Sequence, residues 1–394
     1  MAEIYCRHFN GYKPCGRNSE NSAGGEGCNE NCSSRDLVKT RILFIHLGAI
    51  GAVVRSTALL CAIRKKYAGC HLTWVTQAPA DALLRGHPLI DRVLTTARDD
   101  MLMLSALEFD VGFCVDKSLV AAGVLKQTQV GQMFGFIADE RAGAIVPATP
   151  AAENLWHIGL SNQKKFFENT RPETELVAEA LDLTNFDRDE YDLRLSDRER
   201  QEVEERRRLW AKPDQLIVGL NTGCSDVIPY KKLPVESQRQ LVTELSSMGY
   251  SVVLLGGPED AGRNQRIAHG LPAIESPATR GLRDGLVSVA ACDIVVTGDS
   301  LGMHLAIAMK KWVVAWFGPT CAHEIDLYDR GVKVLTSARC SPCWSRACHK
   351  SPMCYDLVDL QSILAGVARG ASQRRLSNRI FGRCPSDHTA HSPA

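Results

Sequence analysis

Residues 41–52 form the stretch that decides the fold, Arg41-Ile-Leu-Phe-Ile-His-Leu-Gly-Ala-Ile-Gly-Ala52. The apolar run over 41–46 is typical of a buried β-strand, and residues 53–65 after the glycine turn have the spacing of an amphipathic helix. Two further apolar runs follow at 71–76 and 110–115. This alternation predicts βαβ units and a parallel sheet.

A second alternating series occupies the C-terminal half of the chain. Its strands are expected at 216–221, 251–255, 293–297 and 312–317, and its helices at 235–247, 282–291 and 302–309. Before it, Ser196 and Glu199 form a capping box that opens a charged helix through Trp210, in which Glu202 and Arg206 are spaced to pair. The sequence therefore predicts an α/β protein with two Rossmann-like domains, whose ligands bind beyond the carboxyl ends of the strands.

The expected segments are a Cys-rich N-terminal extension (1–40), an N-terminal Rossmann-like domain (41–195), a linker helix (196–214), a C-terminal Rossmann-like domain (215–372) with a Cys-rich loop at 340–354, and a loosely ordered tail (373–394). A length of 394 residues agrees with two domains.

Composition narrows the class of protein. With 45% hydrophobic and 23% charged residues, the chain is predicted to be globular and soluble. Lys and Arg number 46 against 45 Asp and Glu, so nothing in the charge calls for a nucleic-acid partner. The longest apolar stretch, at 43–54, is far shorter than the roughly 20 residues of a membrane-spanning helix. The first 35 residues hold no signal-peptide core, so we expect a cytoplasmic protein.

The first glycine turn does not have the pattern of a dinucleotide site. Gly48 and Gly51 are spaced Gly-x-x-Gly, and Leu72 and Thr73 stand where an acidic residue is expected about 20 positions later. A dehydrogenase is therefore a distant alternative. The turn can also be simply a tight connection in which glycine lets the backbone pack closely.

The turn at 296–304 lies between a strand and a helix in the second series. Small residues there let backbone N–H groups at the helix start point at an anion, and the helix dipole favours negative charge. This arrangement suits a diphosphate. The alternative is that Asp299 or Ser300 only caps the helix.

Six motifs together resemble glycosyltransferase family 9, which contains the ADP-heptose:lipopolysaccharide heptosyltransferases. They are Leu47-Gly-Ala-Ile-Gly51, Asn221-Thr-Gly223, Lys231-Lys-Leu-Pro234, Leu254-Leu-Gly-Gly-Pro258, Gly298-Asp-Ser300 with Met303-His304-Leu-Ala306, and Phe317-Gly-Pro-Thr320. The resemblance covers residues 41–360 and is most specific over 297–320. It implies a GT-B fold, with the acceptor bound mainly by the first domain and the sugar nucleotide mainly by the second.

The implied reaction is inverting transfer of a heptose or related sugar from a nucleoside-diphosphate sugar to a glycan or lipid-linked acceptor in lipopolysaccharide or envelope polysaccharide assembly. Contact with the inner membrane would be peripheral at most. The family resemblance implies transfer without a metal. Asp187-Arg-Asp189 lies in an irregular region before the linker helix and follows no strand, so it is interpreted as a solvated loop and not as a metal motif.

The resemblance also implies site residues. It places a phosphate-binding lysine at Lys231 or Lys232 and a ribose contact at Glu259 or Asp260. The full predicted donor set is Asn221, Thr222, Lys231, Lys232, Glu259, Asp260, Gly298, Asp299, Ser300, Gly302 and His304. Gly51 and Arg55 are predicted to face the acceptor.

The family's catalytic base is absent from its expected position. The resemblance implies an Asp directly after the second glycine of the first turn, and this chain has Ala52 there. A methyl group cannot accept a proton. Three interpretations stay open: an engineered inactive variant, a natural subgroup with another base, or a nucleotide-sugar-binding protein without transferase activity. The candidate substitute bases are His46, Asp116 and Asp299.

Fifteen cysteines in a protein expected to be cytoplasmic favour metal binding over disulfides. Cys340, Cys343, Cys348 and Cys354 have a spacing that suits zinc or a single iron. Cys6, Cys15, Cys28 and Cys32 form a weaker second set in a segment with little apolar material. The alternatives are a reduced Cys-rich loop and a disordered extension.

Overall fold

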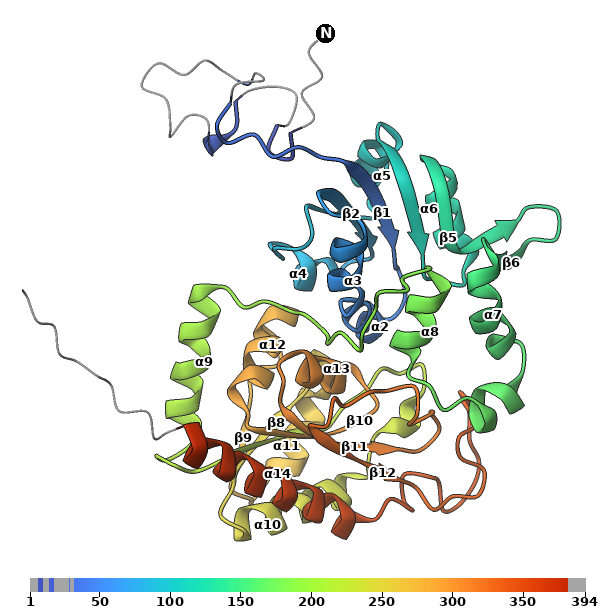
Figure 1. Cartoon of the computed structure of the whole chain (residues 1–394). Helices are drawn as coiled ribbons and strands as arrows, with labels where there is room; N and C mark the ends of the chain where they lie inside the picture. The colour runs from blue at the N-terminus through green and yellow to red at the C-terminus, as the bar shows by residue number, and fades with distance from the viewer. Residues whose placement is uncertain (1–5, 10–13, 18–27, 29–31, 382–394) are drawn as a thin grey trace, which may run out of the picture. The chain divides into compact units, whose positions relative to one another are not determined.

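The structure, a computed structural model, describes residues 6–9, 14–17, 28 and 32–381. The chain separates into two units (Figure 1). Unit 1 contains the chain up to Leu195 together with His323–Asp326, and unit 2 contains Ser196–Ala322 and the chain from Leu327 onward. The helix expected to act as a linker therefore belongs to unit 2.

Unit 1 is built on a six-stranded sheet in the order β3-β2-β1-β4-β5-β6. The strands are β1 (Thr40–Ile45), β2 (Cys70–Thr76), β3 (Arg92–Thr95), β4 (Glu108–Cys114), β5 (Gln129–Asp139) and β6 (Ala144–Pro147). All neighbours pair in parallel except β5 and β6, which are antiparallel. The βαβ prediction is confirmed, although β3, β5 and β6 were not expected.

The helices of unit 1 surround this sheet. They are α2 (Ile50–Ser56), α3 (Leu59–Lys66), α4 (Asp81–Leu84), α5 (Arg98–Ser105), α6 (Leu119–Lys126), α7 (Glu153–Gly159) and α8 (Glu173–Ala180), with short turns η1 (Pro150–Ala152) and η2 (Lys164–Glu168). Residues 42–45 of β1 are fully buried. Aromatic rings of neighbouring strands meet in this core, with the centroids of Phe44 and Trp74 4.2 Å apart. Burial on both faces explains why β1 is continuously apolar.

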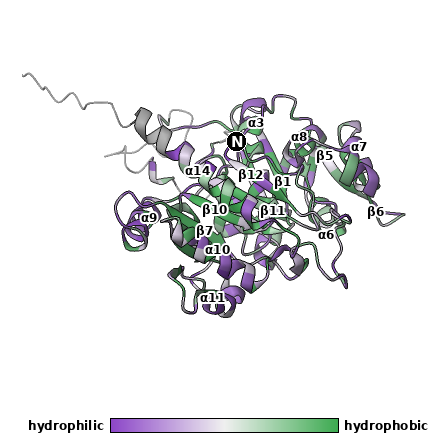
Figure 2. Ribbon diagram, turned by 90° about the horizontal axis from the view of Figure 1, so that it is seen from below, coloured by the Kyte–Doolittle hydropathy of each residue, from purple (hydrophilic) through white to green (hydrophobic). Residues whose placement is uncertain are grey.

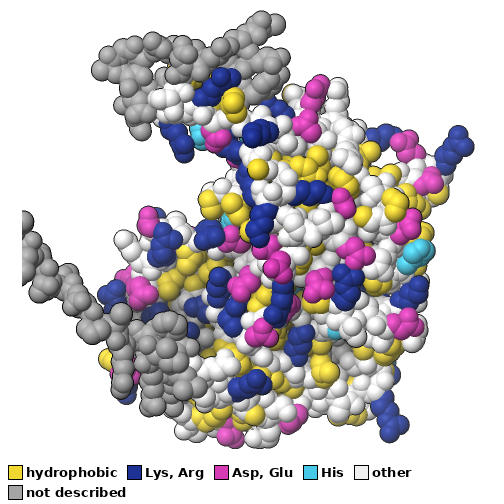
Figure 3. All heavy atoms as spheres, in the orientation of Figure 1, with side chains coloured by type: hydrophobic (Ala, Val, Ile, Leu, Met, Phe, Trp, Pro, Cys, Tyr) yellow, Lys and Arg dark blue, Asp and Glu magenta, His cyan; other side chains and the backbone are white. Residues whose placement is uncertain are grey.

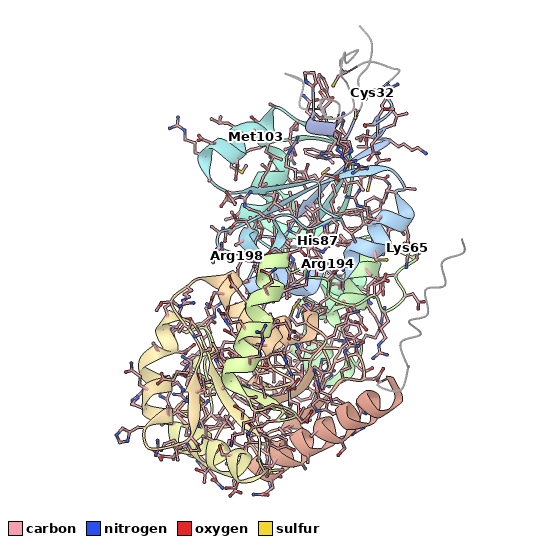
Figure 4. All side chains as sticks on the ribbon, turned by 90° about the vertical axis from the view of Figure 1, so that its left-hand side faces the viewer. Cys32, Lys65, His87, Met103, Arg194 and Arg198 are labelled. Carbon is pink, nitrogen blue, oxygen red and sulfur yellow. The ribbon has the colours of Figure 1, made fainter. Side chains whose placement is uncertain are left out.

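The helix expected over 53–65 is divided into α2 and α3. Thr57 lies at the break, and its hydroxyl donates to the carbonyl oxygen of Val54 at 2.6 Å. The same hydroxyl accepts the backbone N–H of Asp192 at 2.9 Å. The carboxylate of Asp192 in turn lies 3.5 Å from His87 Nε2 and pairs with Arg194 at 2.6 Å. Figure 4 labels His87 and Arg194. The break therefore anchors the last segment of unit 1.

Unit 2 has a fully parallel sheet in the order β12-β11-β10-β7-β8-β9. The strands are β7 (Ile217–Asn221), β8 (Ser251–Leu255), β9 (Ala273–Glu275), β10 (Ile294–Gly298), β11 (Trp312–Phe317) and β12 (Gly331–Leu335). The helices are α9 (Asp197–Trp210), α10 (Val235–Ser247), α11 (Ala261–Ala268), α12 (Leu282–Ala291), α13 (Leu301–Ala308) and α14 (Leu360–Phe381), with turns η3 (Pro229–Lys231) and η4 (Pro258–Asp260). In Figure 2 the central strands are hydrophobic and the outer helices α9 and α11 are largely hydrophilic.

Helix α9 begins with the predicted capping box of Ser196 and Glu199. The predicted pair of Glu202 with Arg206 is wrong. Glu202 pairs with Arg198 at 3.1 Å, whereas Arg206 is buried and pairs with Asp284 of α12. The side chain of Arg206 is buried because its guanidinium donates hydrogen bonds to α12. The acceptors are the carbonyl oxygen and carboxylate of Asp284 and the hydroxyl of Ser288.

Helix α14 continues to Phe381, beyond residue 373 where the tail was expected to lose order. Arg374 on this helix pairs with the fully buried Asp293 at 2.8 Å, which extends the packing of α14. Residues 382–394 of the expected tail lie outside the described residues. In the described part of the chain, no helix is both long and apolar enough to span a membrane. The face in Figure 3 carries positive and negative side chains interspersed.

Candidate active-site residues

Both sheets have the same strand order, so each has a point where the order reverses. In unit 1 this point lies between β1 and β4, and in unit 2 between β7 and β10. Loops beyond the carboxyl ends of such strands form the ligand crevice of a Rossmann-like sheet. The predicted residues His46 and Asp116 follow β1 and β4, and Asn221 and Asp299 lie at the ends of β7 and β10.

Unit 1 has a cavity of about 180 Å³ at its reversal point. It is lined by His46, Ala52, Arg55, Ser56, Leu59, Val115, Asp116, Lys117, Glu173, Thr174 and Val177. The methyl group of Ala52 therefore faces the same cavity as two carboxylates, Asp116 and Glu173. Gly51, which was predicted to face the acceptor, is buried in α2 and is not one of the lining residues.

The carboxylate of Asp116 is fixed by the turn after β1. The backbone N–H groups of Leu47 and Gly48 both donate to it, the latter at 3.1 Å. A Cβ on Gly48 would lie 2.9 Å from Asp116 Oδ1, closer than real side chains pack. Gly48 therefore leaves the space in which the carboxylate approaches the backbone.

His46 is 5% exposed and lies between Ser56 and Asp116. Its Nδ1 is 2.7 Å from the hydroxyl oxygen of Ser56, and its Nε2 is 3.9 Å from Asp116 Oδ1. Burial lowers the pKa of His46 to about 4, although the charge of Asp116 acts in the opposite direction. The imidazole is therefore neutral at neutral pH.

The two cations of the cavity have partners within unit 1. Arg55 Nη2 lies 2.6 Å from Glu173 Oε2, so its charge is compensated within the cavity. Lys117 Nζ donates to the carbonyl oxygen of Leu155 at 3.3 Å and lies 5.0 Å from the ring centre of Phe136. Burial lowers the pKa of Lys117. Arg55, a predicted acceptor contact, thus lines the cavity, where it forms an ion pair with Glu173.

In unit 2, Asn221 connects the ends of β7 and β10. Its Nδ2 lies 3.0 Å from Ser300 Oγ, 3.2 Å from Thr297 Oγ1 and 3.1 Å from the carbonyl oxygen of Gly223. Ser300 is the N-cap residue of α13, but its side chain makes no capping hydrogen bond. The interpretation of Ser300 as a simple helix cap is therefore wrong.

Asp299 pairs with Lys231, with Nζ 3.1 Å from Oδ2. Burial raises the pKa of Asp299, but the charges of Lys231 and His304 help to outweigh it and leave the pKa below 3.8. His304 is itself buried on α13. A charged pair therefore stands directly before the first turn of α13.

Two glycines allow this close packing. A Cβ on Gly298 would overlap the carbonyl oxygen of Lys231, and a Cβ on Gly302 would lie 2.6 Å from the amide of Asn221. The indole N–H of Trp316 donates to the same Lys231 carbonyl at 2.9 Å. These glycines are needed for contacts between protein groups at the start of α13.

Four other predicted donor-binding residues differ in how far they are buried and in their contacts within the protein. Thr222 is fully buried and its hydroxyl donates to the carbonyl oxygen of Leu255 at 3.1 Å. Asp260 accepts the N–H of Gly257 at 3.1 Å, and burial raises its pKa. Lys232 pairs at 3.5 Å with the exposed Asp226. Glu259 lies in η4 beside Asp260, on the turn after β8.

The thiols of Cys340, Cys343, Cys348 and Cys354 line a second cavity of about 200 Å³ in unit 2. Burial and the other three cysteines raise the pKa of Cys354 to about 11. The loop is held by hydrogen bonds from its backbone, including the N–H of Cys348 to the Tyr230 hydroxyl at 3.0 Å. Over the residues that the structure describes, no three or more His, Cys, Asp or Glu side chains are grouped to hold a metal ion. Cys6, Cys15, Cys28 and Cys32 are each partly buried.

Sequence reasoning did not identify three contacts of these sites: Ser56, Glu173 and Tyr230. Ser56 lies ten residues after His46 and meets it only through the turn and helix α2, so periodicity contains no signal for the contact. Glu173 follows an irregular region and reaches Arg55 only through the tertiary fold. Tyr230 directly precedes Lys231, and this proximity was the one available signal.

Two solved structures share this fold. The glycosyltransferase family 9 protein of Veillonella parvula DSM 2008 matches with a TM-score of 0.66 at 17% identity, over 86% of this chain and 99% of that one. The E. coli ADP-heptose LPS heptosyltransferase II matches with a TM-score of 0.65 at 18% identity, over 85% and 99%. The two units therefore have the GT-B fold that the sequence predicted.

Sequence comparisons lead to the same family. Lipooligosaccharide heptosyltransferase 2 of Haemophilus influenzae is 30% identical over 110 residues, which are 26% of this chain and 32% of that protein. The aligned part is thus about a third of the length of that curated relative. The sequence model of glycosyltransferase family 9 (heptosyltransferase) matches residues 103–354, which is more than half of the chain. With these residues matched and both units folded as in its solved members, the chain belongs to glycosyltransferase family 9.

Proposed function

We propose that the chain transfers a heptose or a related sugar from a nucleoside-diphosphate sugar to a hydroxyl of a glycan or lipid-linked acceptor, with inversion, in envelope polysaccharide assembly. Its membership of family 9 supports a glycosyl transfer, and the heptosyltransferase names of its relatives support the sugar. The observation that carries the proposal is the cavity at the end of β1 and β4, which both Asp116 and Ala52 line.

Unit 2 would bind the donor through its diphosphate. The first N–H groups of α13 have no side-chain cap, so an anion can accept their hydrogen bonds. Lys231 supplies a cation beside this helix start, and Asp299 fixes its position. Lys231 is the better candidate of the two lysines, because its pair with Asp299 holds it directly before α13, whereas the partner of Lys232 is the exposed Asp226. These groups would stabilise the charge that develops on the leaving diphosphate.

Asp116 is the proposed general base in place of the missing Asp. It lines the same cavity as Ala52, and two backbone N–H groups fix its orientation. His46 is the weaker candidate because its Nδ1 is already bonded to the Ser56 hydroxyl, and Asp299 is already paired with Lys231. In the reaction, the acceptor oxygen bonds to the anomeric carbon and its proton passes to Asp116. The bond to the diphosphate breaks, and its electron pair leaves with the diphosphate.

The alternative is a nucleotide-sugar-binding protein that has lost its transferase activity. The presence of a fixed carboxylate in the Ala52 cavity favours transfer over this alternative. Gly51 and Arg55 remain our proposed acceptor contacts, with Arg55 acting together with Glu173. We further propose a cytoplasmic location with peripheral contact at the inner membrane, which fractionation of cells would test.

Replacing Asp116 tests the proposal. ADP release from ADP-heptose, in the presence of heptose-deficient lipopolysaccharide, should fall by about 10²–10⁴-fold in Asp116→Asn, because general base catalysis is lost. Asp187→Asn is the matched control, since Asp187 is an exposed loop residue of the same unit. Binding of ADP-heptose by calorimetry should be unchanged in both. Normal turnover by Asp116→Asn would contradict the role of Asp116, and absence of turnover in the native chain would favour the non-catalytic alternative.

We also propose that Cys340, Cys343, Cys348 and Cys354 hold one structural zinc or iron ion, and that transfer itself needs no metal. All four cysteines line one cavity, and the spacing of four soft ligands in one short loop suits either ion. Binding would need the four thiols to move closer together than they lie in the structure. A bound ion would cross-link the loop through its four cysteines.

Elemental analysis tests the metal proposal. For the loop site we expect one metal ion per chain, counted as zinc plus iron. The double change Cys343→Ser and Cys348→Ser should remove this ion. Cys61→Ser is the control, because Cys61 lies apart on α3. Less than one equivalent in the native chain would contradict both this site and the weaker proposed site of Cys6, Cys15, Cys28 and Cys32. A second equivalent, lost in Cys6→Ser with Cys28→Ser, is the result expected for that N-terminal set.

A further inference from the structure

We propose that His46 is a second contact for the acceptor hydroxyl. In this arrangement the neutral imidazole donates its Nε2–H to the acceptor oxygen while Asp116 takes the proton of the same hydroxyl. The inference rests on the proposed function, because it assumes that Asp116 is the base. It assigns His46 a role different from that of a substitute base, and it assigns Ser56 the role of a positioning residue.

The tautomer follows from the two neighbours of the ring. Asp116 Oδ1 lies 3.9 Å from Nε2, so a lone pair on Nε2 would face a carboxylate oxygen and a proton there is favoured. In a neutral ring, Nδ1 is then an acceptor. The hydroxyl of Ser56, 2.7 Å away, is placed to donate to it. Ser56 thus holds both the tautomer and the plane of the imidazole.

The separation of His46 and Asp116 leaves room for one oxygen atom. A distance of 3.9 Å is too long for a direct hydrogen bond. An oxygen about 2.8 Å from each atom would bridge them with ordinary hydrogen-bond lengths. Gly48 keeps this space open, because a Cβ there would lie 3.3 Å from His46 Nε2 and 2.9 Å from Asp116 Oδ1. Both side chains line the cavity, where an acceptor hydroxyl can enter.

Burial keeps the imidazole of His46 neutral, so the ring can donate one N–H to the cavity. Two charged groups act on the ring: Asp116, which favours the imidazolium, and Arg55, which opposes it. Arg55 is paired with Glu173 on the other side. Burial outweighs the effect of Asp116, so the ring stays neutral over the range in which glycosyl transfer would be measured. A neutral ring offers one N–H to the cavity in every catalytic cycle.

Two substitutions at His46 separate donation from proton transfer. Glutamine can place an N–H near the position of Nε2 but cannot act as a base at neutral pH, whereas phenylalanine keeps the ring shape and loses the donor. We expect His46→Gln to retain at least about a third of kcat. His46→Phe should lose about 10-fold or more of kcat, and Ser56→Ala about 3-fold, the range expected for loss of one hydrogen bond. His87→Gln is the control, because His87 is a buried histidine of the same unit outside the cavity.

The assay is ADP release from ADP-heptose with heptose-deficient lipopolysaccharide, measured from pH 5 to 9. Both His46 variants should keep the affinity of the native chain for ADP-heptose, and His46→Gln should keep its pH profile. Native kcat in His46→Phe, with Asp116→Asn inactive, would overturn the inference and leave the proposed function standing. An inactive but folded His46→Gln would also overturn it, because that result indicates a base. Full activity in Asp116→Asn would overturn the inference as well, because Asp116 would then not be the base. Only absence of turnover in the native chain would show that the proposed function itself is wrong.

Discussion

Gly48 shows how much of the site depends on single residues. The sequence identifies it only as part of a glycine turn, for which a dinucleotide site is a distant alternative to a tight connection. The structure assigns it a packing role, because its missing side chain lets Asp116 and His46 approach the turn. The same holds for Gly298 and Gly302, which make room for Lys231 and Asn221. Sequence identifies such glycines, but their partners come from distant segments.

Gly48→Ala tests this role. The new Cβ would displace Asp116, so we expect kcat for ADP release to fall at least about 10-fold while the affinity for ADP-heptose is kept, since a misplaced catalytic group is costly to the rate. The matched control is Gly123→Ala in α6, where a Cβ meets nothing within 4 Å. Unchanged kcat in Gly48→Ala would contradict the assigned geometry.

The Lys231–Asp299 pair predicts a dependence of stability on pH. The pKa of Asp299 is lower in the folded chain than its ordinary value of 3.8. The stabilisation that ionised Asp299 gives to the folded chain is therefore complete above about pH 4. It is lost as the pH falls through the lower pKa that Asp299 has in the folded chain. Lys231→Met should reduce the free energy of unfolding by about 2 kcal/mol at pH 7, because it leaves a mostly buried carboxylate unpaired.

Denaturant unfolding at pH 7 and pH 3 measures this effect. The difference between Lys231→Met and the native chain should shrink at pH 3, because the carboxyl of Asp299 that has lost its partner can then be protonated in the variant. Lys232→Met is the control, because its partner Asp226 is exposed and such pairs contribute about 0–1 kcal/mol. Equal stability of the native chain and Lys231→Met at pH 7 would rule out a stabilising pair.

Among the elements, the strongly periodic segments of unit 2 agree best with their predictions. The bounds of β8, α10, α12 and β11 match the structure because each is a clear apolar run or amphipathic helix between glycine or proline turns. The short strand β3 and the antiparallel pair β5 and β6 were missed. Gln129–Asp139 mixes polar and apolar residues because much of β5 is exposed, so its strand signal is weak.

Helix α14 illustrates a packing requirement that sequence periodicity does not contain. Gly370 lies against Trp312 of β11, and a Cβ there would overlap the indole. Gly370→Ala should therefore lower the free energy of unfolding by about 1–3 kcal/mol through overpacking. Gly285→Ala in α12 is the control, since it has open space and gains helix propensity. Thermal unfolding compares the two, and an unchanged midpoint for Gly370→Ala would contradict this packing.

At the scale of the whole molecule, the sequence predicts two Rossmann-like folds but does not predict that residues 323–326 belong to unit 1. This segment is held there by backbone and ionic contacts. The N–H of Glu173 donates to the carbonyl oxygen of Glu324 at 3.0 Å, and Lys165 pairs with Glu324 at 3.6 Å. Domain prediction from a sequence assumes continuous segments, and no composition change marks this return of the chain.

The family-9 assignment and the two reversal points make donor binding by unit 2 the central claim. Titration of ADP-heptose into the full chain, followed by calorimetry, measures it most directly. We expect one binding site per chain, an affinity at least about 10-fold weaker in Lys231→Met because a charge-assisted contact to phosphate is lost, and a small change in Lys232→Met. Absence of binding in the native chain, or equal affinity in the native chain and Lys231→Met, would contradict the account.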